Sequence, residues 1–156
     1  MRWAGAGDVA RAEVALGAEA ELCVAALEAH RPRSPAFCLC HGDFSPNHGL
    51  DLGRGPGMID WDSFRRGAVE LDAGRFLASL SQRAGRRGVL AANVAPAAES
   101  FLAGIAGLVE RDQLAWYRAG ALVKLSWRLS ARRPKRWRER ARSLLSEARA
   151  ALEAGG

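Results

Sequence analysis

The sequence predicts an α+β fold that is mostly α-helical, with a small β-hairpin region between one leading helix and four later helices. Two observations lead to this prediction. Apolar residues recur at three- and four-residue steps before residue 30 and after residue 67, as they do on the buried face of a helix. Between these segments, short apolar runs flank the Gly- and Pro-rich stretch 53–57, which is typical of a turn between strands.

The size and composition of the chain suit one globular domain. Its 156 residues are 49% hydrophobic and 26% charged, which is enough for a core and too apolar for a disordered chain. The sequence contains no internal repeat and no interdomain linker. We therefore expect a single domain over 1–156, with a leading helix and linker (1–36), a hairpin region (37–66) and a helical subdomain (67–156).

The leading helix is expected to begin at Asp8, a favourable N-cap residue, and to end near His30. It cannot continue through Pro32 and Pro35, because proline lacks the backbone N–H that a helix needs. One face of this helix carries the apolar residues Leu16, Ala20, Cys23 and Leu27.

Three short strands are expected in the hairpin region. The sequence FCLC at 37–40 predicts a buried strand of small and apolar residues. Segments 49–52 and 58–61 predict two further strands, paired as a hairpin across the turn at 53–57. Polar residues follow the first and third of these strands, and loops on a rigid scaffold are where proteins often place their chemistry.

Four helices are expected after residue 67, at 69–83, 89–109, 112–131 and from Pro134 to about 153. Pro96 is a candidate break in the second of them. The third should bury one stripe, formed by Leu114, Tyr117, Ala121, Leu125 and Leu129.

The formal net charge is +6, and much of the excess lies in RRPKRWRERAR at 132–142. Such a cluster can bind nucleic acid, and the affinity would then fall steeply with salt. No nucleic-acid-binding motif accompanies the charge, and Glu139, Glu147 and Glu153 are interspersed in the same helix, so we favour a solvated helix over a nucleic-acid binder, which stays the less favoured alternative.

The three cysteines, Cys23, Cys38 and Cys40, do not make a disulfide framework. The number of cysteines is odd, and the N-terminal stretch lacks the apolar segment of an export signal. Together these features predict reduced thiols in a cytoplasmic protein. No apolar run approaches the roughly 20 residues that span a bilayer, so no membrane association is expected. Cys38, Cys40 and His41 lack a second ligand pair at zinc-like spacing.

Two carboxylates, Asp43 and Asp60, stand at strand exits that should lie at the same end of the hairpin region. One carboxylate that accepts a proton from a hydroxyl, and another that holds a divalent cation, are the minimum for metal-assisted phosphoryl transfer. Mg²⁺ prefers oxygen ligands, which suits Asp60 and also Asp62. A glycosidase also uses two carboxylates, but the sequence does not fix their separation.

The blocks HGDFSPNH and GMIDWDSFRRGAVELDAGRFL together resemble the aminoglycoside phosphotransferase and choline kinase family, which is distantly related to protein kinases. The resemblance covers about residues 37–80 and keeps both order and spacing. It implies a protein-kinase-like C-terminal lobe that uses ATP (or GTP) and Mg²⁺ to phosphorylate a small-molecule hydroxyl acceptor, aminoglycoside-like or choline-like.

The resemblance also implies roles for single residues. Asp43 matches the catalytic base, His41 the residue that packs under the catalytic loop, and Asp60 the metal-binding aspartate. Asp72 matches the aspartate that braces the catalytic loop, although an ordinary first-turn carboxylate would look the same in sequence. Asp62 is either a supporting acid near the metal or an exposed side chain.

One departure from the family pattern concerns the pocket residues Asn47 and His48. Five residues after the catalytic aspartate the family has Asn or Gln, whereas this chain has His48, with Asn47 one place earlier. Imidazole is a poorer Mg²⁺ ligand than an amide oxygen. Three alternatives remain open: Asn47 takes the metal, His48 binds Mn²⁺ or donates to a phosphate, or this metal position is degraded.

A second departure concerns the N-terminal lobe, which in the family covers the nucleotide and supplies a lysine. About 40 residues precede the HGD motif, and the lysines of the chain are Lys124 and Lys135. We therefore expect this lobe to be absent from the chain, which would be a fragment, a late start or half of a split protein with a separately encoded lobe. Activity of the isolated chain is then doubtful, and a non-catalytic remnant or binding module is the alternative function. Trp116, Tyr117 and Trp127 are either core residues or the lining of a site for a cationic acceptor.

Overall fold

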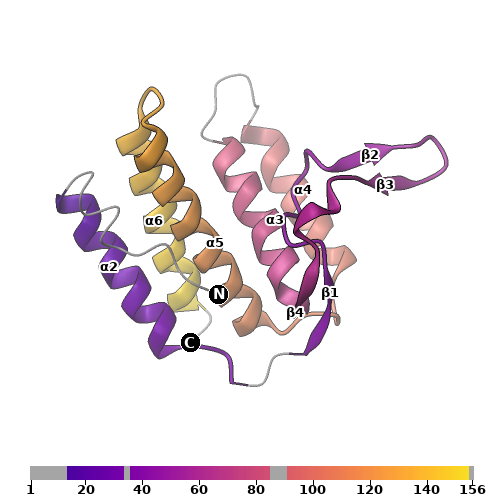
Figure 1. Ribbon diagram of the computed structural model, residues 1–156, viewed down its shortest axis with the longest axis horizontal. Coiled ribbons are helices and arrows are strands. Elements are labelled where there is room, and N and C mark those ends of the chain that lie inside the picture. Colours follow the sequence, from indigo (N-terminus) through magenta and orange to yellow (C-terminus); the bar gives the residue numbers. More distant parts are fainter. Residues whose placement is uncertain (1–13, 34–35, 85–90, 155–156) are drawn as a thin grey trace.

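The structure, a computed structural model, describes residues 14–33, 36–84 and 91–154 and is mostly helical with two small antiparallel sheets (Figure 1). This confirms the predicted α+β class. The elements follow in the order α2 (Val14–Ala29), β1 (Phe37–Cys40), β2 (Gly49–Asp51), β3 (Pro56–Met58), the short 3₁₀ helix η1 (Trp61–Ser63), β4 (Arg65–Ala68), α3 (Val69–Ala84), α4 (Ala91–Gly104), α5 (Arg111–Arg132) and α6 (Trp137–Ala154). The predicted N-cap Asp8 lies outside the described residues.

The main core forms where α5 packs against α2, α3 and α6. The apolar face predicted for the leading helix is buried in this core, and Leu122 of α5 and Leu145 of α6 pack against it. Each fully buried leucine contributes about 1.5–3 kcal/mol relative to an exposed one. Trp116 is buried here too, and its indole Nε1–H donates to the Leu27 carbonyl at 2.7 Å.

Polar contacts complete the helical body. Glu147 of α6 accepts a hydrogen bond from Ser81 Oγ of α3 at 2.6 Å, and it also pairs with Arg118 of α5. Three helices therefore meet at this one carboxylate. None of the helices in the described part of the chain combines the length and the apolar character needed to cross a bilayer.

The helix boundaries differ from the sequence prediction in two places. Pro96 lies within α4 without breaking it, and α4 ends at Gly104 rather than near residue 109. The predicted start of this helix at residue 89 lies outside the described residues. The last helix begins at Trp137 and not at Pro134, because Arg133 and Arg136 have positive φ angles of 47° and 59°, which a helix does not accept.

The β region contains one strand more than the sequence predicted. As predicted, β2 and β3 form a hairpin, with Gly49 opposite Met58. The third strand ends at Met58, however, because Asp60 has a left-handed backbone with φ 67° and a 3₁₀ turn follows it. The unpredicted strand β4 pairs antiparallel with β1, with Phe37 opposite Ala68.

Two predictions about burial were wrong. Strand β1 buries Cys40 alone and exposes its first three residues. On α5 the fully buried residues include Ala119 and Leu122, whereas Tyr117, Ala121 and Leu125 of the predicted stripe are half-buried. The three cysteines are free thiols, as predicted, and burial raises the pKa of Cys40 to about 12.

Candidate active site

The backbone after β1 is held by a carboxylate from the first turn of α3. Asp72 Oδ2 accepts a hydrogen bond from the His41 N–H at 2.6 Å, and its Oδ1 accepts one from the Gly42 N–H at 2.9 Å. Hydrogen bonds to an ionised acceptor are stronger than neutral ones. Asp72 thus fixes the chain immediately before Asp43, and it does more than a first-turn carboxylate that only faces the helix dipole.

Gly42 makes close contact between this loop and η1 possible. Its φ angle is +78°, and a Cβ atom there would overlap the backbone carbonyl of Ser63. Glycine is the residue that meets both demands, a left-handed backbone and no side chain. The middle position of His-Gly-Asp is therefore required by the approach of the segment that follows Asp60.

His41 ties the same two segments together through its ring. The ring is buried and its Nδ1 accepts a hydrogen bond from the Asp43 N–H at 3.3 Å. The proton must then lie on Nε2, which donates to the Ile59 carbonyl at 2.8 Å. His41 therefore sets the position of Asp43 relative to the residue just before Asp60.

His48 lies between the two candidate carboxylate segments. Its Nδ1–H donates to the Asp43 carbonyl at 2.7 Å, and its Nε2 lies 3.4 Å from Asp60 Oδ2. Its ring stacks on His41 with centroids 5.4 Å apart. Asn47 instead directs its amide oxygen to Arg83. Of the two pocket residues predicted from sequence, His48 is thus the one beside Asp60.

Asp60 and Asp62 are both exposed and lie at the start of the 3₁₀ turn. The left-handed backbone of Asp60 turns its carboxylate toward His48, and such backbone outliers cluster at functional sites. Asp62 forms no hydrogen bond or ion pair with any residue that the structure describes. The structure brings Asp60, and not Asp62, to the histidine.

Asp60 Oδ2 and His48 Nε2 are the two atoms that could serve together as ligands of a divalent cation. The proton on Nδ1 is fixed by the Asp43 carbonyl, which leaves Nε2 for the metal, an arrangement common for metal-binding histidines. Within the described ranges, no group of three or more His, Cys, Asp or Glu side chains could hold a metal by itself. A cation here would take its remaining ligands from water and phosphate oxygens, as Mg²⁺ usually does.

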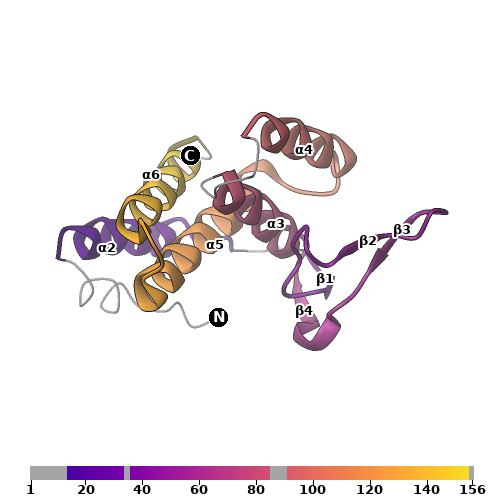
Figure 2. The same cartoon turned by 90° about the horizontal axis from the view of Figure 1, so that it is seen from above.

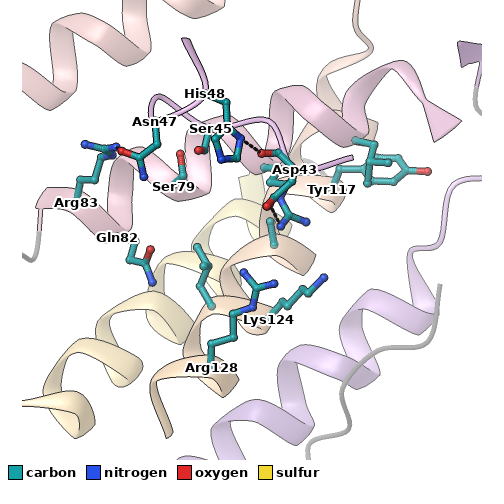
Figure 3. Close-up of a pocket in the computed structure, with 14 residues that line it drawn as sticks. Asp43, Ser45, Asn47, His48, Ser79, Gln82, Arg83, Tyr117, Lys124 and Arg128 are labelled. Carbon is teal, nitrogen blue, oxygen red and sulfur yellow. Dashed lines mark hydrogen bonds and ion pairs between the residues drawn. The ribbon is translucent and has the colours of Figure 1, made fainter. Parts of the chain in front are cut away.

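Asp43 faces a cavity of about 210 Å³ between the 43–48 loop, α3 and α5 (Figure 3). Its Oδ1 pairs with Arg75, which reaches across from α3. Its Oδ2 has no hydrogen-bond partner in the described part of the chain. The residues that line the cavity are Asp43, Ser45, Asn47, His48, Leu71, Arg75, Ser79, Gln82, Arg83, Tyr117, Ala121, Lys124, Leu125 and Arg128.

Sequence reasoning missed the cations that line this cavity, among them Arg75, Lys124 and Arg128. A signal for each exists in hindsight. Arg75 follows Asp72 by three residues and so shares its helix face. Lys124 and Arg128 are four residues apart, so they lie one above the other on the helix, beside the stripe of Ala121 and Leu125 that was assigned to the core. Of the three aromatic candidates, Tyr117 lines the cavity, Trp116 is core and Trp127 packs against that core.

Comparison with known families identifies a family for most of the chain. A sequence model described as the phosphotransferase enzyme family matches residues 1–116, which is most of the chain and includes both candidate motifs. Searches among curated proteins and among solved structures gave no significant match.

Proposed function

The chain belongs to the phosphotransferase enzyme family, and from this we propose that it is the kinase-like C-terminal lobe of a small-molecule kinase. The proposed reaction transfers the γ-phosphoryl group of ATP to a hydroxyl of a small acceptor. The observation that carries the proposal is the position of His48, which contacts the Asp43 backbone and the Asp60 carboxylate at once. One residue thereby links the proposed base to the proposed cation ligand.

Asp43 is the proposed base. Phosphoryl transfer needs a group that orients the acceptor hydroxyl and takes its proton, while most of the catalysis comes from positioning and charge. Oδ2 is available for this proton and borders the cavity, while Arg75 holds Oδ1 and so fixes the plane of the carboxylate. Asp72 and His41 act as positioning residues, because they hold the backbone that carries Asp43.

Asp60 and His48 are the proposed cation ligands. A divalent cation between this pair and the nucleotide would offset the negative charge of the transferring phosphates. Imidazole nitrogen binds Mn²⁺ and other transition metals better than it binds Mg²⁺, so we expect Mn²⁺ to be at least as effective as Mg²⁺ here.

We further propose that a nucleotide-binding lobe, in the same or another polypeptide, packs on the hairpin region. Seven of the ten exposed large apolar side chains among the described residues lie at 37–64: Phe37, Leu39, Leu50, Leu52, Ile59, Trp61 and Phe64. Exposed apolar side chains gathered in this way are typical of an interaction surface. Ile59 and Trp61 directly flank Asp60 in the sequence, where the nucleotide phosphates would have to be covered.

Paramagnetic broadening by Mn²⁺ in NMR spectra tests the cation site even when binding is weak. We expect broadening of the resonances of His48 and Asp60 in the native chain, enhanced by ATP, and a loss of this broadening in Asp60→Asn. Asp62→Asn is the matched control and should behave as the native chain. Equal broadening in native chain and Asp60→Asn would refute the assignment.

A transfer assay tests the reaction itself. When the nucleotide-binding lobe of a family member is supplied, covalently or as a separate chain, transfer of labelled γ-phosphate should appear and Asp43→Asn should abolish it. One observation favours a second candidate, a binding module without transfer: the ion pair between Asp43 and Arg75 occupies part of the base. Mn²⁺ and nucleotide binding without transfer, with the lobe supplied, would support that candidate.

A further inference from the structure

The charge of the cavity beside Asp43 is strongly positive. Among its lining residues, Arg75, Arg83, Lys124 and Arg128 are cations and Asp43 is the one carboxylate. The Asp43 charge is already matched by Arg75. Three cations are thus left without a carboxylate in a small, half-enclosed site.

Two of these cations make no direct polar contact within the described residues. Arg83 donates to the neutral amide of Asn47, but Lys124 and Arg128 form no hydrogen bond or ion pair with any described residue. They stand one turn apart on α5, both half-buried, across the cavity from Asp43 and His48 (Figure 3). Groups in this situation are normally found opposite an anion.

The surroundings penalise both charges. The pKa of Lys124 is lowered first by burial and then by Arg75 and Arg128. The pKa of Arg128 is lowered by burial and by Arg75, and the charge of Asp43 offsets part of this effect. Holding these cations together costs the free protein stability, and a bound anion would reverse that cost.

The rest of the cavity limits the size and shape of the ligand. A volume of about 210 Å³ is below the roughly 300–1,000 Å³ that is usual for drug-sized ligands. Tyr117, Ala121 and Leu125 form a half-apolar wall beside the cations, which suits a short carbon chain. Tyr117 is the one Phe, Tyr or Trp side chain of the lining, so these described residues form no aromatic cage for a quaternary ammonium group.

From these observations we propose that the acceptor is a small anionic alcohol, a phosphate monoester or carboxylate with a free hydroxyl, whose anion binds Lys124 and Arg128 while its hydroxyl reaches Asp43. This rests on the proposed function for the role of Asp43. It replaces cationic acceptors of the aminoglycoside or choline kind, which the net positive charge of the cavity would repel. The anionic group is shared with nucleotide phosphates, and the experiment distinguishes the two sources.

The test measures equilibrium binding of glycerol 3-phosphate and 3-hydroxybutyrate to the chain without metal or nucleotide. At least one of these probes should bind, and ethyl phosphate, which lacks the hydroxyl, should bind several-fold more weakly than glycerol 3-phosphate. Lys124→Gln and Arg128→Gln should each weaken binding about tenfold to a hundredfold, the usual effect of losing hydrogen bonds to a charged group. Lys124→Arg should retain binding.

The matched control is Arg132→Gln, which removes the same charge one turn further along α5, outside the cavity lining. Its binding should stay within about twofold of the native chain. The two cavity variants should unfold at the same or a higher denaturant concentration than the native chain, because each removes a like-charge contact. If a cavity variant is damaged in its folding, the denaturant concentration at its unfolding midpoint falls below that of the native chain. Lys124→Arg, which keeps the positive charge, then shows whether that charge is what the anion needs.

Four results would overturn the proposal. The first is tighter binding of choline or an aminoglycoside than of either anionic probe, and the second is an Arg132→Gln variant that weakens probe binding as much as the two cavity variants do. The third is displacement of the bound anion by metal-free ATP, and the fourth is no binding of either anionic probe. Displacement by ATP would assign the cations to the nucleotide. Anion binding by this pattern in a chain that never transfers phosphate, even with a nucleotide-binding lobe, would keep the binding site and refute the proposed enzyme alone.

Discussion

Replacing Asp72 separates a brace on the candidate catalytic loop from an ordinary helix-dipole contact. In Asp72→Ala, the N–H groups of His41 and Gly42 lose their acceptor in a buried stretch of backbone. Hydrogen bonds to a charged group contribute about 1.5–3 kcal/mol each, and the half-buried position of Asp72 favours the lower end. We therefore expect a loss of about 3 kcal/mol in the free energy of unfolding.

Two further variants sharpen this measurement. Asp72→Asn keeps one acceptor oxygen but turns an amide N–H₂ toward the other backbone donor, so it should cost about 2 kcal/mol. Asp112 is also a first-turn carboxylate, on α5, and is exposed without a hydrogen-bond partner among the described residues. A dipole contact is worth about 0.3–1 kcal/mol, which is the loss expected for Asp112→Ala.

Urea unfolding followed by circular dichroism measures all three variants against the native chain. The midpoint should fall in the order Asp112→Ala, Asp72→Asn, Asp72→Ala at unchanged slope. A loss for Asp72→Ala no larger than that for Asp112→Ala would refute the brace. The carboxylate would then be a first-turn charge and nothing more.

Substitutions test three other features. Gly42→Ala should lower the free energy of unfolding by about 3 kcal/mol or more, because the new methyl group adds a clash to a left-handed backbone. Gly53 is the control, since it has a φ of +72° but open space around it. Gly53→Ala should therefore show the backbone strain alone, about 1–2 kcal/mol. Burial raises the pKa of Cys23 from its ordinary 9.0 to about 11, so the unfolded chain ionises first and stability should fall between pH 9 and 11. Cys23→Ala should remove that part of the slope, on the order of 2 kcal/mol, and an unchanged slope would contradict a protonated thiol. Glu147→Ala should lower the free energy of unfolding by about 1–2 kcal/mol, because three helices meet at this carboxylate. Glu153→Ala removes one partner of an exposed ion pair and should cost less than about 0.5 kcal/mol. Equal losses would show that the junction at Glu147 does not contribute to stability.

The helices were predictable from sequence because a 3.6-residue apolar period and flanking prolines leave few alternatives. The first helix shows this most clearly, since its four predicted core residues are all buried. Strand β4 was not predictable in the same way. Its sequence RRGA has no alternating pattern, and it becomes a strand because β1 lies beside it, with Gly67 against Cys40.

The candidate site was predictable as residue types but not as contacts. The spacing of HGD and IDWD indicated Asp43 and Asp60, and the structure adds that His48 connects them. The pairing of Asp43 with Arg75 depends on how the loop meets α3, and a single sequence carries no record of that. The position of Lys124 and Arg128 depends on the rotation of α5, which packs on more than one side and so has no single apolar stripe.

The β2–β3 hairpin extends away from the helices in both views of the molecule (Figures 1 and 2), whereas Asp43 is anchored on α3 through Asp72. A two-stranded ribbon that packs on little else opens far more often than a helical body. Amide hydrogen exchange should therefore be rapid at 49–58 and slow in α3 and α5. The segment that carries Asp60 is tied to the HGD loop through the Ile59 carbonyl, so a partner that packs on the hairpin would order the ribbon beside a site that is already formed.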